Sequence, residues 1–316
     1  MNSYSDSSEF LFAVTQLLNG SLVAFPTETV YGLGADASNS QAVARIYSVQ
    51  GRPNNHPLIV HIASMESMGD WAREVPKYAI ALARSFWPGP MTLILKRSEL
   101  AGDFITGGQD SVGVRVPNHV VALALLEAFE CYGGKGVAAP SANRFGHVSP
   151  TTAAAVTEEL GNYLSKDDLV LDGGSCDVGV ESTIIDCTGT EPSVLRPGAI
   201  SVAMIEECTG LKTAQSYKGI RVSGALENHY APIAQVLLRE NAVAGQGFIA
   251  HANIETPPGV IRLASPSDDD EFARILYSAL RDTDARGLAE VVVVQPTGTG
   301  IAVAIRDRLS RAANGR

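Results

Sequence analysis

A stretch without helical or strand periodicity, residues 209–232, divides the chain into two unequal parts. Glycine and proline residues punctuate it, namely Gly210, Gly219, Gly224 and Pro232. A chain of 316 residues also exceeds the size of one average domain. We therefore predict a first domain over residues 1–208, a linker over 209–232 and a small second domain over 233–316. A linker of this length in a compact protein is often functional, so we expect it to act as a lid.

The first part carries short apolar runs and amphipathic stretches in an irregular order. Their periodicity predicts helices over residues 9–18, 39–49, 76–86, 119–129, 151–160 and 202–208. It predicts strands over residues 21–25, 58–62, 91–95, 112–116, 137–139, 169–171, 182–186 and 194–195. Because these strands do not alternate strictly with helices, we expect an α/β fold with a mixed sheet rather than a purely parallel one.

The second part has a more regular pattern. Strands are predicted over residues 235–238, 247–250, 259–263 and 289–294, and helices over residues 268–284 and 300–313. The helix that begins near residue 268 has three aspartates in its first turn, where the helix dipole favours negative charge. This pattern predicts a small α/β, Rossmann-like domain with a parallel sheet.

The overall charge limits the possible partners. The net charge is -10 and the pI is about 5.1, which argues against a protein that grips a nucleic-acid backbone over its whole surface. A local basic cleft within an acidic shell stays compatible with these values. The four cysteines are widely spaced, so neither a zinc site nor any other protein-held metal is expected. We expect no signal peptide and no membrane span, and hence a cytoplasmic location.

Polar side chains gather just after several predicted strands, where α/β sheets often bind ligands. Residues 25–34 follow the first strand and contain hydroxyls, a carboxylate and a phenol, although a tight polar turn would look similar. Arg52 lies in a loop stiffened by two prolines, and its fork suits phosphate or carboxylate. His61 ends an apolar strand, where a structural role is more common. Arg115 lies within an apolar strand and needs an anion, either a ligand or a structural carboxylate.

Two further segments suit an anionic ligand. Residues 138–151 pass from a strand through small residues, including Ser141 and Asn143, to a helix start that suits phosphate or is ordinary capping. Residues 172–198 supply another hydroxyl pair and Arg196. The sequence contains none of the motifs GxxxxGK[ST], GxGxxG, GxSxG and HExxH. Arginines and hydroxyls without an evident nucleophile indicate an enzyme that positions reactants and stabilises negative charge at a phosphate.

These segments occur in the order PTETVYGLG, GRPNNHPLIVHI, WPGPMTL, VGVRVP, APSAN, SPT, DGG, GVESTIID and LRPG. Together they closely resemble the YrdC-like family of threonylcarbamoyl-adenylate synthases, over about residues 17–210. The sequence His229-Tyr230-Ala231-Pro232 and the α/β segment after it resemble the two-domain form of that family. The resemblance implies a twisted mixed sheet with a concave cationic cleft.

The resemblance also implies a reaction. Threonine is N-carboxylated by bicarbonate, and the new carboxylate attacks the α-phosphate of ATP, giving threonylcarbamoyl-AMP and pyrophosphate. Mg²⁺ accompanies the ATP. A separate transferase complex then modifies an adenosine of tRNA, and binding of tRNA by this chain itself would be weak.

The resemblance assigns residues to each substrate. Threonine would contact Thr27, His61, Arg115, the backbone of Ala139, and Ser182. ATP would contact Gln50, Arg52, Asn54, Thr106, Ser141, Asn143, Ser149, Arg196 and Tyr230, the last of these closing over the nucleotide. For the chemical step itself the resemblance points to Arg52, Ser141 and Asn143.

One position departs from the family pattern, because Gln50 stands where the family has a lysine. Charge-assisted hydrogen bonds are roughly twice as strong as neutral ones, so we expect weaker ATP binding or a slower step. Another cation, such as Lys135 or Arg144, would compensate if it entered the cleft. Two other functions stay open: an RNA-binding module without catalysis, and a carbamoyl transferase that acts on another acceptor.

Overall fold

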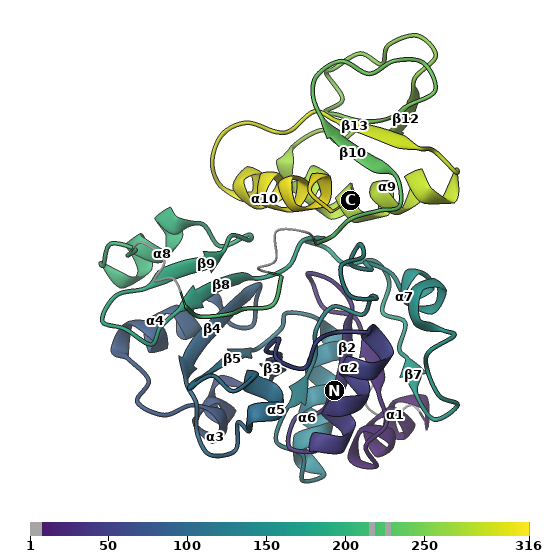
Figure 1. Ribbon diagram of the computed structural model, residues 1–316. Helices are drawn as coiled ribbons and strands as arrows, with labels where there is room; N and C mark the ends of the chain where they lie inside the picture. Colours follow the sequence, from purple (N-terminus) through teal and green to yellow (C-terminus); the bar gives the residue numbers. More distant parts are fainter. Residues whose placement is uncertain (1–7, 215–218, 225–228, 316) are drawn as a thin grey trace.

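The computed structural model describes residues 8–214, 219–224 and 229–315. Within these ranges the strands form two sheets, one of nine strands in the first domain and one of four in the second. Figure 1 shows the second domain above the first, with α9 (Asp269–Ala285) and α10 (Ile301–Ala313) on the side nearest the first domain. No helix among the described residues is both long enough and apolar enough to cross a membrane.

The first sheet is mixed, as predicted. Its strands are β1 (Val23–Phe25), β2 (Gly32–Asp36), β3 (Ile59–His61), β4 (Met91–Lys96), β5 (Ser111–Arg115), β6 (Val137–Ala138), β7 (Leu169–Val170), β8 (Thr183–Asp186) and β9 (Ser193–Arg196). Their order across the sheet is β7-β1-β2-β6-β3-β5-β4-β8-β9. The pairs β1–β7, β3–β5 and β4–β8 are parallel and the others antiparallel.

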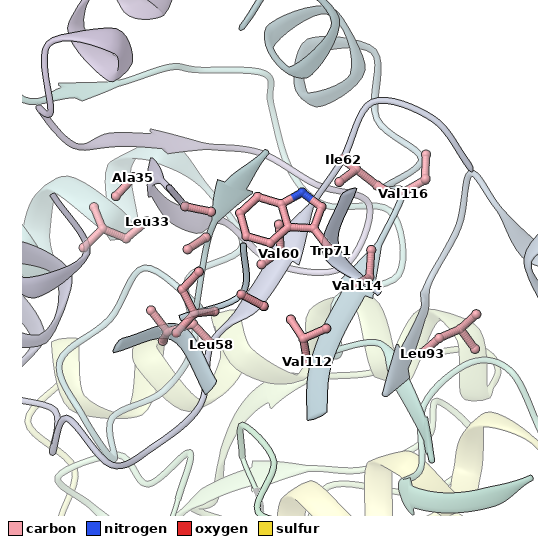
Figure 2. Close-up of a cluster of buried hydrophobic side chains, with 14 of the residues drawn as sticks. Leu33, Ala35, Leu58, Val60, Ile62, Trp71, Leu93, Val112, Val114 and Val116 are labelled. Carbon is pink, nitrogen blue, oxygen red and sulfur yellow. The ribbon is translucent and has the colours of Figure 1, made fainter. Parts of the chain in front are cut away.

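One face of this sheet packs into the main hydrophobic core. Successive residues of a strand point to opposite faces, so Val60, Val114 and Leu93 share this face across three neighbouring strands. Figure 2 shows them in one cluster with the fully buried Trp71. The Nε1–H of Trp71 donates to the carbonyl of Lys135 at 3.0 Å, which satisfies the polar atom of this large side chain.

The opposite face is covered in two different ways. Over β1, β2 and β6 it is covered by α1 (Ser8–Leu18) and α6 (Val120–Cys131), whose apolar residues pack on Val23, Phe25 and Val137. Over β3, β4, β5 and β8 there is no such helix among the described residues, and Ile59, Ile94 and Ile184 form a smaller apolar floor. This part of the sheet is therefore free to carry a site.

The other helices of the first domain lie around the main core. They are α2 (Ser40–Gln50), the 3-10 turn η1 (Met65–Ser67), α3 (Met68–Trp71), α4 (Lys77–Phe86), α5 (Asp103–Thr106), α7 (Ala153–Leu160) and α8 (Val202–Thr209). Asn39 caps the start of α2, because its side chain accepts hydrogen bonds from the backbone N–H groups of Gln41 and Ala42. The short elements η1, α3 and α5 escaped the sequence analysis, since a single turn of helix has too few residues to show a period.

The second domain has the parallel sheet expected from its sequence. The strands β10 (Gln235–Leu238), β11 (Gly247–Ile249), β12 (Ile261–Ala264) and β13 (Glu290–Val293) run in the order β10-β13-β11-β12, and every pair is parallel. Buried residues of α9 and α10 form one cluster with Val30, Val148 and Val180 of the first domain. The two domains therefore share a hydrophobic core.

Only part of the predicted linker can be described, because residues 215–218 and 225–228 lie outside the described ranges. Of its described part, residues 219–224 pass over the apolar floor, where Val222 packs with Ile59, Ile94 and Ile184. Further on, the backbone N–H of Ala231 donates to the carbonyl of Gly146. The described linker thus lies against the first domain before it reaches β10.

Strand β2 is not evident from the sequence, in which residues 25–34 have the composition of a polar loop. Its composition is poor in the β-branched and aromatic residues typical of strands. Close packing explains the glycine at position 34. A Cβ there would lie 2.8 Å from the Phe25 ring, 2.8 Å from a Val137 methyl and 2.9 Å from the Val23 carbonyl. Gly34 makes the segment look unlike a strand in the sequence, yet the absence of a side chain at this position allows the strand to pack beneath α1 and α6.

We predict that Gly34→Ala lowers the free energy of unfolding by about 1–3 kcal/mol, because the added methyl overpacks this face. The matched control is Gly69→Ala, since no heavy atom lies within 4 Å of a Cβ at that helical position. The control should be neutral or slightly stabilising. Denaturant unfolding measures both variants, and equal stability of the two would contradict the packing described.

Candidate active site

A small cavity lies on the sheet face that α1 and α6 leave free. It is lined by Thr27, Thr29, Val30, Gly32, Ile59, His61, Arg115, Ala139, Pro140, Ser141, Glu181, Ser182, Arg196, Ser223, Gly224, His229 and Tyr230. Strand ends of the first domain form its walls and the linker closes it. The free volume is about 30 Å³, enough for about two water molecules. A nucleotide needs far more space, so the described conformation is closed.

His61 and Arg115 lie side by side on neighbouring parallel strands. They are direct register partners of β3 and β5, so both side chains project from the same face. Burial and the nearby Arg115 charge lower the pKa of His61 to about 3, which keeps the ring neutral near pH 7. Its Nδ1 is buried and has no hydrogen-bond partner among the described residues. An unpartnered buried nitrogen beside a cavity is ready for a ligand.

Arg115 has a carboxylate partner within the protein. Its Nη2 lies 2.7 Å from Oε1 of Glu28, and both side chains are only 5% exposed. Its Nε donates to the Gly89 carbonyl at 3.2 Å and its Nη1 to the Thr29 hydroxyl at 3.0 Å. The structural ion pair considered from the sequence is therefore present. The contact with Glu28 is an ion pair without hydrogen-bond geometry, so of the five N–H donors of the guanidinium those on Nη2 remain for a ligand.

A tight turn sets the hydroxyls beside Arg115. The Thr27 hydroxyl donates to the Val30 carbonyl at 2.7 Å and accepts from the backbone N–H of Thr29 at 3.2 Å. The hydroxyls of Thr27 and Thr29 are also 2.8 Å apart. The sequence allowed residues 25–34 to be either a tight polar turn or a ligand-binding loop. The structure shows a polar turn whose residues line the cavity, so the segment is both.

Ser182 and Arg196 form a second wall. The Arg196 Nε donates to the Ser182 carbonyl at 3.1 Å, and its Nη2 donates to the Ser182 hydroxyl at 3.1 Å. That hydroxyl also lies 2.8 Å from the hydroxyl of Thr92. Burial lowers the pKa of Arg196. No carboxylate of the described residues forms an ion pair with it.

Arg52 is not a lining residue, but it contacts the lining through Ser223. Its Nη2 donates to the Pro57 carbonyl at 3.1 Å and to the Ser223 hydroxyl at 3.3 Å, while its buried Nε has no partner among the described residues. Burial lowers the pKa of Arg52 to about 10, so it stays charged near pH 7. Arg196 meets the same linker residue, since its Nη1 donates to the Ser223 carbonyl at 2.9 Å.

Tyr230 closes the cavity from the linker side. It is 1% exposed, has a positive φ of 63°, and its hydroxyl has no partner among the described residues. Its ring stacks on Tyr277 of α9 with 5.7 Å between centroids. His229 meets it edge to face at 4.1 Å. A bulky residue with positive φ is held there by its surroundings, which is typical of switch segments.

Ser141 and Ala139 line the cavity, and Gln50 contacts Ser141 without being a lining residue itself. The Gln50 Nε2 donates to the Ser141 carbonyl at 2.6 Å. The backbone N–H of Ala139 donates to the Ile59 carbonyl at 3.0 Å. The residue that replaces the family lysine is thus buried outside the cavity lining and bonded to the backbone of a lining residue.

Asn143 and Ser149 lie behind the cavity rather than on its surface. The Asn143 Nδ2 donates to the carbonyls of Arg144 at 2.7 Å and His147 at 3.0 Å, which leaves its buried Oδ1 without a partner among the described residues. The Ser149 hydroxyl donates to Oε1 of Glu181 at 2.6 Å. In this conformation Ser149 reaches the cavity only through Glu181, which lines it.

Two predicted ATP residues lie away from the cavity lining in the closed conformation. Asn54 is exposed in the loop after α2. Thr106 is 1% exposed at the end of α5, and its hydroxyl accepts from Nη1 of Arg97 at 3.2 Å. Their part in ATP binding stays a prediction.

Neither candidate cation that was considered for Gln50 lines the cavity. The Lys135 Nζ pairs with Asp70 at 3.3 Å on the surface. Arg144 donates to the Val49 carbonyl at 2.6 Å and lies over the Tyr163 ring. The cationic side chains of the lining are Arg115 and Arg196.

Several residues of the site were not singled out from the sequence. Glu28, Thr29 and Glu181 lie within recognised motifs, but their partners are far away in the chain. Ser223 and His229 lie in the linker, where no period marks a contact. The sequence does contain a signal for Glu181, because a carboxylate at the start of an apolar strand is expected to be buried and to need a cation as its partner.

The described residues contain no group of three or more His, Cys, Asp or Glu side chains that could hold a metal ion. Glu181, the carboxylate among the lining residues, is already paired with Arg308, and Glu28, next to the lining residues Thr27 and Thr29 in the chain, is paired with Arg115. The donor set of the closed cavity therefore does not fit a metal bound by protein side chains alone.

Two family models cover nearly the whole chain. The Sua5/YciO/YrdC model, described as Telomere recombination, matches residues 15–198. The model described as Threonylcarbamoyl-AMP synthase, C-terminal domain, matches residues 200–314. The chain belongs to the threonylcarbamoyl-AMP synthase family. This confirms the resemblance and makes the chain an enzyme of the AMP-transferring kind.

Relatives of known name agree over the full length. The threonylcarbamoyl-AMP synthase of Pyrococcus abyssi is 40% identical over 318 residues, covering 94% of this chain and 92% of the relative. That of Bacillus subtilis is 36% identical, covering 96% and 92%. The crystal structure of P. abyssi Sua5 complexed with L-threonine matches with a TM-score of 0.86 and 37% identity, covering 98% of this chain and 95% of that one.

We predict a specific pH dependence from His61. Its pKa is lower in the folded chain than in the unfolded one, so the unfolded chain binds a proton that the folded chain does not. Stability is therefore full above about pH 6.5 and falls toward pH 3, by at most about 1.4 kcal/mol per pH unit from this residue. His61→Asn should flatten the curve of unfolding free energy against pH in that window. An unchanged slope would contradict the buried neutral ring.

Proposed function

We propose that the enzyme joins L-threonine, bicarbonate and ATP into threonylcarbamoyl-AMP and pyrophosphate. Family membership over both domains supports this activity. We further propose that the product passes to a transferase complex that modifies an adenosine of tRNA in the cytoplasm. The transfer itself would need no contact between this chain and tRNA.

The observation that carries the proposal is a pair of buried guanidiniums without carboxylate partners. Arg52 and Arg196 are 8% and 3% exposed, and neither forms an ion pair among the described residues. Burying an unpaired charge is costly, so such a site is built for an anion. Both guanidiniums meet Ser223 of the linker, one at its hydroxyl and one at its carbonyl. We infer that these oxygens stand where phosphate oxygens bind.

We assign threonine to the part of the cavity around Thr27, His61, Arg115, the backbone of Ala139, and Ser182. The unused N–H donors of Arg115 suit the threonine carboxylate while Glu28 keeps its ion pair. Neutral His61 offers a hydrogen bond without repelling a cation. The substrate amine is then close to the phosphate region, which favours a reaction between bound partners.

The chemistry fits groups that position reactants and stabilise charge. The threonine amine attacks bicarbonate, water leaves, and a carbamate forms. A carbamate oxygen attacks the α-phosphorus and pyrophosphate departs. Arg52 and Arg196 would stabilise the charge that develops on the phosphates. We propose that Ser141 and Asn143 orient the nucleotide in this step.

The closed cavity has room for about two water molecules, so ATP must displace the linker. We propose that residues near Ser223 move away from Arg52 and Arg196 when the triphosphate enters. Tyr230 would then close over the nucleotide, and exclusion of water would protect the labile adenylate.

Mg²⁺ would enter with ATP rather than as a resident ion. The carboxylates at or next to the cavity, Glu181 and Glu28, are paired with guanidiniums, so the triphosphate and water would supply its ligands. Its chemistry there is to neutralise phosphate charge.

Pyrophosphate release by the purified enzyme tests the proposal. We expect release from ATP only when both L-threonine and bicarbonate are present. Omission of either substrate is the internal control. Turnover with carbamoyl phosphate instead of threonine would favour another acceptor, and salt-dependent RNA binding without turnover would favour the RNA-binding alternative.

A second prediction concerns Gln50. An ammonium in its place can donate to the same Ser141 carbonyl and also adds charge near the phosphates. We expect Gln50→Lys to raise kcat/KM for ATP about fivefold. Gln50→Met, which has similar length and no donor, should lower it. Unchanged or lower kcat/KM in Gln50→Lys would show that the amide is adapted to this site.

A further inference from the structure

Arg308 of α10 is a charged residue within a buried helix face. Its neighbours on that face, Ala304, Ile305, Leu309 and Ala312, belong to the core that both domains share. The Arg308 side chain is 0% exposed. A buried guanidinium needs well-placed hydrogen-bond acceptors, and all but one of those that Arg308 uses lie in the first domain.

The guanidinium reaches across the domain boundary to Glu181. Its Nε donates to Oε2 of Glu181 at 2.7 Å, and its Nη2 donates to the carbonyls of Pro197 at 3.0 Å and of Glu181 at 3.3 Å. Within its own helix, Nη1 donates to Asp307 at 2.6 Å. The second domain thus holds both the carboxylate and the backbone of Glu181.

Glu181 in turn collects donors from both domains. It accepts from the Ser149 hydroxyl at 2.6 Å and from the Tyr277 hydroxyl at 2.9 Å. Burial alone would raise the pKa of Glu181, but the charges of Arg308 and Arg196 outweigh it and lower the pKa to about 2. An ionised carboxylate therefore lines the cavity beside Arg196, where it would repel phosphates if it were not neutralised.

The same arginine supports the linker. Its guanidinium carbon lies 5.4 Å from the centre of the Tyr230 ring, and Tyr230 stacks on Tyr277. A cation over an aromatic face is attracted to it. Arg308 therefore contacts both the carboxylate of the cavity wall and the aromatic residue that closes the cavity.

We propose that Arg308 is a positioning residue of the nucleotide site, through which the second domain neutralises Glu181, fixes Ser149 and supports Tyr230. The proposal rests on the proposed function, since it concerns how ATP is bound. Threonine would bind around Thr27 and Arg115, which Arg308 does not contact. Loss of Arg308 should therefore weaken ATP binding much more than threonine binding.

Steady-state kinetics of four proteins test this. Arg308→Met should raise KM for ATP about tenfold or more and leave KM for threonine within about twofold. Glu181→Gln combined with Arg308→Met removes both charges, and KM for ATP should return to within about threefold of wild type. Arg286→Met is the matched control, because that second-domain arginine pairs only with Asp282 of its own helix among the described residues and is half exposed. It should behave as wild type.

A structural role alone gives a different result. If Arg308 only held the domains together, both KM values would shift together and the double variant would not recover. Should Arg308→Met fail to fold, Tyr277→Phe removes only one hydroxyl donor from Glu181 and should still raise KM for ATP selectively. An unchanged ratio of the two KM values in every folded variant overturns the inference. Absence of turnover in wild type would instead contradict the proposed function.

Discussion

Arg52 and Arg196 are buried guanidiniums that form no ion pair with a carboxylate among the described residues. They lie against Ser223 of the linker and determine much of the surrounding structure. Burial makes each costly unless an oxygen faces it, and in the closed conformation Ser223 supplies oxygens to both. These hydrogen bonds stabilise the linker in the cavity when no nucleotide is present. A ligand that brings stronger, charged oxygens can take over these donors, because charge-assisted hydrogen bonds are stronger than neutral ones.

The site can form on the sheet because the helices cover one of its two faces only in part. One face is packed against the main core along its length, whereas α1 and α6 cover only the β1, β2 and β6 part of the other. The remaining part carries an apolar floor on which Val222 rests, with His61 and Arg115 at its edge. Successive side chains of a strand point to opposite faces of the sheet. In each of these strands, one residue therefore packs in the core and the next faces the cavity side.

Much of this was accessible from the sequence, for physical reasons that can be named. The mixed sheet and the parallel second sheet followed from the periodicity of apolar residues, which shows within a few residues of the chain. Strand β2 could not be predicted in this way, because its glycines are required by close packing against residues of neighbouring strands. The pairing of Glu28 with Arg115, and of Glu181 with Arg308, joins residues far apart in the chain, and no local pattern specifies such partners.

The central claim is that Arg52 and Arg196 hold the phosphates of ATP and that Ser223 occupies their place beforehand. A crystal structure with a non-hydrolysable ATP analogue and L-threonine tests it most directly. The account predicts phosphate oxygens in contact with both guanidiniums and Ser223 displaced from them. An analogue bound elsewhere, with both Ser223 contacts still intact, would contradict it.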